Sequence, residues 1–105
     1  MTISILRFTF AAPGDDPRSR HERLRGALEL AQWGDGHGVT GVSVDEHHAT
    51  GYGWSSNPIL AASWFLAATA RMFATADCAL APLWDPIRMA EDIAQVDAMS
   101  RGRLY

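Results

Sequence analysis

Four ionisable residues in a row, Asp45, Glu46, His47 and His48, stand at the end of the valine-containing segment 41–45. An imidazole titrates close to neutral pH, so a histidine at such a position can give or take a proton during a reaction. A strand end with only a structural role more commonly carries Asn, Gly or Ser. The pattern predicts that at least one of the two histidines takes part in acid–base chemistry.

Two other interpretations of this segment stay open. The histidines could bind a metal ion, although adjacent residues of a strand point to opposite faces and are poorly placed to share one ion. Alternatively, Glu46 and one histidine could hydrogen-bond to neighbouring strands and only fix the loop. Cys78 is the single cysteine, which excludes an internal disulfide and a cysteine-based zinc cluster.

The composition bounds the remaining function classes. The 105 residues fit one soluble domain, with 48% hydrophobic and 20% charged residues and a net charge of −3, which disfavours nucleic acid as a partner. All basic residues are arginines, which excludes chemistry that needs a lysine. The longest apolar stretch, 59–70, is shorter than the roughly 20 residues of a membrane span, and no signal peptide is evident, so we expect a cytoplasmic protein.

The elements that must position these residues alternate along the chain. Strands are predicted at 3–10, at 41–45 and within 72–82, and 103–105 resembles the start of a fourth. Helices are predicted from a cap at Asp16 to about residue 33, from Pro58 to about 70 and from Pro86 to about 99, where a proline follows a capping Asp or Asn. This βαβαβα pattern favours a parallel sheet with right-handed crossovers.

Two details of packing are predicted as well. Val42 and Val44 are expected on the inner face of the sheet. The last helix is expected to bury one face, whose residues follow the i, i+3, i+4, i+7 spacing: Ala90, Ile93, Ala94 and Asp97.

Two α/β architectures accommodate this order, an open doubly wound sheet and part of a (β/α)8 barrel. A dinucleotide-binding sheet needs a glycine-rich turn after the first strand, but segment 11–16 there carries two aspartates, and the spaced glycines of 34–38 follow a helix instead. A whole barrel needs about 250 residues. We therefore expect residues 1–105 to be a single, incomplete TIM barrel domain, containing the first three βα units and the start of strand four.

An ordered set of motifs carries a resemblance to a known family. Glu46-His47-His48 ends the second strand, Asn57-Pro58 opens the next helix, and the segments 85–92 and 97–103 follow. Together these motifs resemble the N-terminal part of the bacterial luciferase-like family of flavin-dependent monooxygenases, over nearly the whole chain.

The resemblance implies a barrel that binds reduced FMN, or a deazaflavin in some branches, and inserts one oxygen atom of O2 into a small organic substrate. It also implies a flavin reductase as supplier and a homo- or heterodimer of the full-length protein. Since the family's chain continues through strands four to eight, the isolated 105 residues are expected to be inactive. They are also expected to bind flavin weakly or not at all, and to self-associate or be partly molten. The alternatives are a non-catalytic flavin-binding relative and a metal-dependent barrel hydrolase.

The resemblance also assigns site residues. His47 would lie beside the flavin and act in proton transfer or in stabilising the oxygenated cofactor. A bulge and a non-proline cis peptide are expected under the flavin at the end of the third strand, where Asp77 departs from the small apolar residues of the family. The remaining expected contacts are Glu46, Ala76, Asp77 and Cys78 for the cofactor, and His48 and Trp54 for the substrate-side loop.

Overall fold

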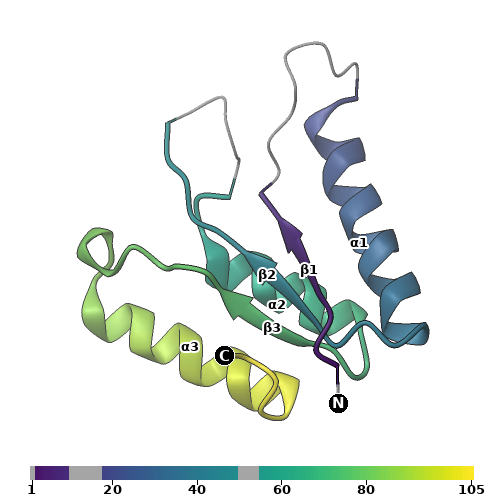
Figure 1. Ribbon diagram of the computed structural model, residues 1–105. Helices are drawn as coiled ribbons and strands as arrows, with labels where there is room; N and C mark the ends of the chain where they lie inside the picture. Colours follow the sequence, from purple (N-terminus) through teal and green to yellow (C-terminus); the bar gives the residue numbers. More distant parts are fainter. Residues whose placement is uncertain (1, 10–17, 50–54) are drawn as a thin grey trace.

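The computed structural model describes residues 2–9, 18–49 and 55–105. Three parallel strands, β1 (Ile5–Phe8), β2 (Gly41–Val44) and β3 (Phe73–Ala76), form a sheet in the order β1-β2-β3 (Figure 1). The strands are shorter than predicted, but their order and direction confirm the parallel βα pattern. Leu104 makes an isolated parallel bridge to Ala74, at the position where a fourth strand is predicted to begin.

Three α-helices, α1 (Arg20–Gly36), α2 (Pro58–Ala68) and α3 (Pro86–Ser100), alternate with the strands, and a short 3-10 helix, η1 (Ala81–Leu83), precedes α3. Asn57 caps α2 and Asp85 caps α3 through their side chains, as predicted. The predicted start of the first helix at residues 16–17 is wrong. Ser19 caps α1, and its reciprocal hydrogen bonds with Glu22 form a capping box that fixes the start at Arg20.

The helices cover one face of the sheet, and α2 lies behind the strands in Figure 1. Val42 and Val44 are fully buried in the core on this covered face, together with Ala62 and Phe65 of α2. The prediction that these valines lie on the inner face is therefore wrong. Because successive side chains of a strand point to opposite faces, the side chains that do not face the helices lie on the uncovered face of the sheet. They include Ser43 of β2 and its partner Arg7 of β1.

The C-terminal helix is rotated relative to the prediction. It packs against α2 and buries Val96 and Ser100, whereas Ala90 and Ile93 are exposed. Ser100 is buried because its hydroxyl bridges the helix end, donating to Asp97 O and accepting from the next loop. The prediction from the spacing of apolar residues therefore identified the wrong face of α3, because the buried face includes the polar residue Ser100.

Arg103 joins three elements at the C-terminal ends of the helices. Its guanidinium donates to Leu66 O in α2, to Ser100 O in α3 and to Met72 O before β3. A cation at a helix C-terminus is favourable because the last carbonyl groups there lack intrahelical partners. Arg103 thus ties α2 and α3 to the sheet close to the bridge made by Leu104.

Asp35 organises the same end of the strands as Arg103, just before β3 begins. Its carboxylate accepts hydrogen bonds from the backbone N–H groups of Ala70, Arg71 and Met72, at 2.8 to 3.0 Å. Burial alone would raise the pKa of Asp35, but these three N–H groups outweigh it and hold the pKa below its ordinary value. The end of α1 is thereby fixed to the turn between α2 and β3.

Asp35→Ala is expected to lower the free energy of unfolding by about 1–3 kcal/mol, because three N–H groups lose their acceptor. The depressed pKa means that the wild-type advantage exists above the ordinary Asp pKa and disappears as the pH falls. Urea denaturation at neutral and at acidic pH measures both effects. Asp35→Asn, which keeps one acceptor oxygen, should lose less. Equal urea midpoints for wild type and Asp35→Ala at neutral pH would show that the clamp contributes nothing.

Among the described residues, no helix combines the length and apolarity needed to cross a bilayer.

Candidate functional site

The acidic and histidine residues after β2 form two interleaved pairs. His47 Nε2 lies 3.3 Å from Asp45 Oδ2, and His48 Nε2 lies 2.6 Å from Glu46 Oε1. Each pair joins residues two positions apart in an extended segment. Successive side chains of such a segment point to opposite faces, so the members of a pair share a face and the two pairs lie on opposite faces. The two histidines therefore lie beside different carboxylates, and only His48 is hydrogen-bonded to its carboxylate.

Glu46 is the structural centre of the second pair. Its side chain is 0% exposed, and both oxygens are occupied. Leu80 N–H donates to Oε2 at 2.6 Å, and the indole N–H of Trp84 donates to the two oxygens at 3.1 and 3.2 Å. Together with His48, these donors connect the end of β2 to the loop after β3.

The pKa of Glu46 is held below its ordinary value. Burial alone would raise this pKa, because it disfavours the charged form. The hydrogen bonds from His48, Leu80 N–H and Trp84 outweigh burial. Glu46 is thus an ionised carboxylate built into the scaffold of the site.

The first pair is arranged differently. The His47 side chain is 39% exposed, whereas that of Asp45 is only 6% exposed. Within the described residues, Asp45 Oδ1 is buried without a hydrogen-bond partner. The backbone of His47 is fixed, because its N–H donates to Ser55 O at 2.8 Å. His47 therefore presents a partly accessible imidazole on a backbone that is hydrogen-bonded to Ser55, with a buried carboxylate beside it.

The end of β3 lies against the same edge. Asp77 N–H donates to Val44 O at 2.7 Å, and the Asp77–Cys78 peptide is cis, as the family resemblance implied. The Asp77 carboxylate lies 3.6 Å from the Arg7 guanidinium and accepts a hydrogen bond from Ser43 at 3.5 Å. The acidic side chain that departs from the family pattern is therefore paired with a cation.

The structure thus brings most of the predicted site residues to the carboxyl ends of β2 and β3: Glu46, His47, His48, Ala76, Asp77 and Cys78. Trp54 lies outside the described residues. Sequence reasoning missed Trp84 and Leu80 as partners of Glu46, because they follow it by more than thirty residues. It also missed Arg7, although the alternation of strand one placed that residue opposite Leu6 and Phe8 and could have indicated it.

Within residues 2–9, 18–49 and 55–105, no group of three or more His, Cys, Asp or Glu side chains could hold a metal ion. The observed pairing of each histidine with its own carboxylate accounts for this.

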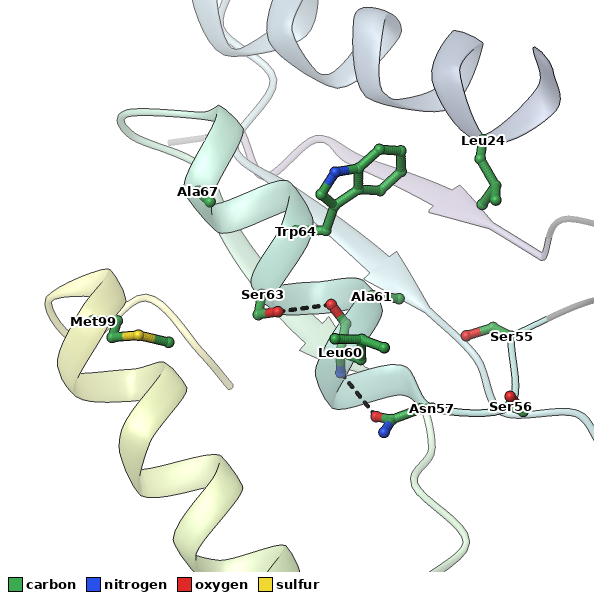
Figure 2. A pocket seen from close by; sticks show the side chains of 10 residues that line it. All are labelled: Leu24, Ser55, Ser56, Asn57, Leu60, Ala61, Ser63, Trp64, Ala67 and Met99. Atoms are coloured by element: carbon green, nitrogen blue, oxygen red, sulfur yellow. Dashed lines mark hydrogen bonds between the residues drawn. The ribbon is translucent and has the colours of Figure 1, made fainter. Parts of the chain in front are cut away.

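A groove of about 560 Å³ lies over α2 (Figure 2). It borders the site through Ser55, whose carbonyl accepts from His47 N–H. Its lining carries no acidic, basic or histidine side chain and consists of Leu24, Ser55, Ser56, Asn57, Leu60, Ala61, Ser63, Trp64, Ala67 and Met99. The titratable side chains of the candidate site thus lie at the sheet edge and not in this groove.

Comparisons with known proteins agree on one family. The family model described as luciferase-like monooxygenase matches residues 1–105. The alkanal monooxygenase alpha chain of Photorhabdus laumondii is 32% identical over 85 residues, which cover 81% of this chain and 24% of that protein. The oxygenase component of the flavin-dependent trigonelline monooxygenase of Acinetobacter baylyi is 29% identical over 89 residues, 85% of this chain and 25% of that protein. The chain spans about a quarter of the length of these relatives.

Solved structures have the same arrangement of elements. Monooxygenase RslO1 from Streptomyces bottropensis matches with a TM-score of 0.86 and 26% identity, over 97% of this chain and 31% of that one. The oxygenating constituent of 3,6-diketocamphane monooxygenase from Pseudomonas putida, solved with FMN, gives a TM-score of 0.85 at 21% identity, over 98% of this chain and 28% of that one. The α/β fold with its parallel sheet is thus similar to the fold of these monooxygenases.

Proposed function

Because the chain belongs to the luciferase-like monooxygenase family, we propose that it supplies the first three βα units of a (β/α)8 barrel. The whole protein would use reduced flavin and oxygen to oxidise a small organic substrate. One observation carries this proposal beyond family membership. A partly exposed histidine on a fixed backbone stands at the carboxyl edge of a parallel sheet, beside the end of the next strand. Active sites of such barrels lie at this edge.

The residues at the edge fit a flavin in their size and chemistry. Ala76 and Cys78 are small, and Cys78 is exposed, so a planar ring can lie against this segment without displacing a bulky side chain. The Asp77 charge is balanced by Arg7 and would not stand alone beside the cofactor. The Glu46 side chain is fully buried and bonded, so we assign it to the support of the site from behind.

Reduced flavin, when bound, supplies the electrons that activate oxygen. The chain's own residues would do the rest. His47 would hold or move a proton at its imidazole, since this ring is partly accessible and imidazole is a common general acid and base. Glu46 and Trp84 would keep the loop after β3 in place, and Ala76, Asp77 and Cys78 would bear against the cofactor. His48 and Trp54 would belong to the substrate side.

FMN is the proposed form of the cofactor, with a deazaflavin as the alternative. The complex of the diketocamphane enzyme with FMN supports this choice. The name of the trigonelline enzyme's oxygenase component supports a separate reductase as supplier of reduced flavin. A dimer of the full-length protein and a cytoplasmic location complete the proposal.

The test uses the full-length protein with chemically reduced FMN or a reduced deazaflavin, and oxygen. We expect saturable flavin binding, measured by fluorescence, and substrate-dependent oxidation of the reduced cofactor in a panel of small aldehydes, ketones and aromatic compounds. Absence of binding and of turnover with both cofactors would overturn the proposal. Binding without turnover across the panel would instead favour a non-catalytic flavin-binding relative.

A further inference from the structure

The contact between His48 and Glu46 is a hydrogen bond of 2.6 Å between His48 Nε2 and Glu46 Oε1. Either partner of such a bond can be the donor, because an imidazole nitrogen donates when it carries a proton and accepts when it does not. The other hydrogen bonds of the Glu46 carboxylate determine which atom holds the proton here.

The Glu46 carboxylate is an acceptor at both oxygens. Leu80 N–H donates to Oε2, and the indole N–H of Trp84 donates to both oxygens. These hydrogen bonds, together with that of His48, hold the pKa of Glu46 below its ordinary value. An ionised carboxylate has no proton to donate. The proton in the bond between Glu46 and His48 therefore belongs to Nε2 of the imidazole.

The second ring nitrogen of His48 is then an acceptor, because a neutral imidazole carries one N–H group and one lone pair. The His48 side chain is 42% exposed and that of Glu46 is 0% exposed, so the accessible part of the ring lies away from the carboxylate. Within the part of the chain that the structure describes, no hydrogen bond or ion pair engages Nδ1. Of the three donors to Glu46, the Leu80 N–H and the Trp84 indole offer no second polar atom, whereas His48 does.

We propose that Glu46 is a positioning residue that fixes the Nε2–H tautomer of His48, and that Nδ1 of His48 accepts a hydrogen bond from a substrate with a hydroxyl or N–H group. The substrate class rests on the proposed function, whereas the tautomer does not. A hydrogen bond to one ring nitrogen fixes which nitrogen is protonated and how the ring is oriented. Because the ring is held before a substrate arrives, less freedom is lost when the substrate binds.

The first test measures the tautomer without any cofactor. Two-bond nitrogen–proton spectra of the full-length protein, at a mildly alkaline pH where imidazole is neutral, distinguish a protonated from an unprotonated ring nitrogen. For His48 we expect a protonated Nε2 and an unprotonated Nδ1. His37 is the internal control, because its Nδ1 lies 2.6 Å from the carbonyl oxygen of Trp33, which can only accept. His37 should therefore show the opposite tautomer.

The variant Glu46→Gln should invert the tautomer of His48. Its amide keeps one acceptor oxygen and gains an NH2 group. The Leu80 N–H and Trp84 indole N–H require the oxygen at the Oε2 position, which places the NH2 group against His48 Nε2. Nε2 must then accept, and the proton moves to Nδ1, while the His37 spectrum stays unchanged. An unprotonated His48 Nε2 in the wild type, or an unchanged His48 tautomer in Glu46→Gln, would overturn the inference.

The second test measures substrate choice with pairs of hydroxyl compounds and their methyl ethers, which lack the donor. The wild type should prefer the hydroxyl compound by roughly 3–10-fold in kcat/KM, the net effect of one hydrogen bond. His48→Ala should lose this preference. Glu46→Gln should lose it too, because an Nδ1–H group can donate to either oxygen. The ratio of two kcat/KM values is independent of the folded fraction, so a loss of stability alone cannot change it.

His37→Ala is the matched control for substrate choice, since His37 follows α1 at the other end of β2, and it should keep the preference. A preference that persists in His48→Ala would contradict the role of Nδ1 in substrate binding.

These outcomes also separate the inference from the proposed function. A wild type that has the expected His48 tautomer but neither binds nor oxidises reduced flavin would refute the monooxygenase assignment and retain the Glu46–His48 geometry. An active wild type with the opposite tautomer would do the reverse.

Discussion

Replacing His47 with alanine is expected to lower the rate of substrate oxidation by the full-length protein by about 10²–10⁴-fold, the usual range for a lost acid–base group. The imidazole is the accessible titratable side chain of the Asp45–His47 pair, with 39% of its side chain exposed. A partly exposed side chain contributes little to the core, so the melting temperature and flavin affinity should change much less than the rate. Single-turnover kinetics with pre-reduced flavin measure the effect apart from flavin supply.

His48→Ala is the informative control for this prediction. His48 donates to the buried Glu46 carboxylate, so its loss should lower stability more than it lowers the rate at matched folded fraction. An equal loss of rate in His48→Ala, with none in His47→Ala, would show that the other histidine carries the proton.

The largest loss of stability is expected for Glu46→Ala, about 3–5 kcal/mol of the free energy of unfolding, in the range measured when one member of a buried charged network is removed. The substitution leaves Leu80 N–H and the Trp84 indole N–H without their acceptor, and it removes the anion beside His48. Chemical denaturation followed by tryptophan fluorescence measures the loss, and Trp84 emission should shift because its indole loses the carboxylate.

The same carboxylate should make stability depend on pH. The pKa of Glu46 is lower in the folded chain than its ordinary value, so the unfolded chain takes up a proton first as the pH falls. The contribution of Glu46 is therefore complete above its ordinary pKa and is lost as the pH falls through the folded value. The gap in stability between wild type and Glu46→Gln should narrow in acid.

Glu29→Gln provides a matched control for these measurements. Glu29 pairs with Arg25 on the surface of α1, with 62% of its side chain exposed, and such pairs contribute about 0–1 kcal/mol. If Glu46→Ala and Glu29→Gln have the same denaturation midpoint, the buried network does not stabilise the fold.

The parts of the fold that could be predicted from the sequence depend on local chemistry. Asn57-Pro58 and Asp85-Pro86 open helices because each cap accepts a hydrogen bond from a residue three positions away, a relation that the sequence itself displays. The same rule predicted a cap at Asp16, but α1 begins at Arg20. Its start is fixed by the reciprocal hydrogen bonds between Ser19 and Glu22.

The face on which Val42 and Val44 lie could not be obtained in this way. Alternation separates a strand into two sets of side chains but does not say which set faces the helices. Here the apolar set of β2 packs on α2, and the polar set with Ser43 faces away. The pairing of Ser43 and Arg7 with Asp77 identifies the uncovered face, and it becomes visible only when three strands are aligned.

The sequence predicted where the candidate site lies, but not which hydrogen bonds hold its residues in place. The end of the second strand is recognisable from 45–48 alone. The Leu80 and Trp84 donors that hold Glu46 lie 34 and 38 residues further along the chain, and no periodicity links positions so distant. Which carboxylate serves His47 and which serves His48 follows from the extended backbone, once its strand character is established.

The register of the sheet has a consequence for how the chain acquires its structure during synthesis. Strand partners such as Ile5 and Gly41, or Gly41 and Phe73, are separated by a complete helical crossover, and Asp35 meets Ala70 at a separation of 35 residues. Each pairing must close a long loop before any hydrogen bond compensates for the lost chain entropy. A growing chain therefore has capped helices available early and sheet pairing only after each complete βα unit has emerged. The hydrogen-bond network of Glu46 should consequently be completed late, after the segment beyond β3 has emerged and its Leu80 and Trp84 N–H donors have docked.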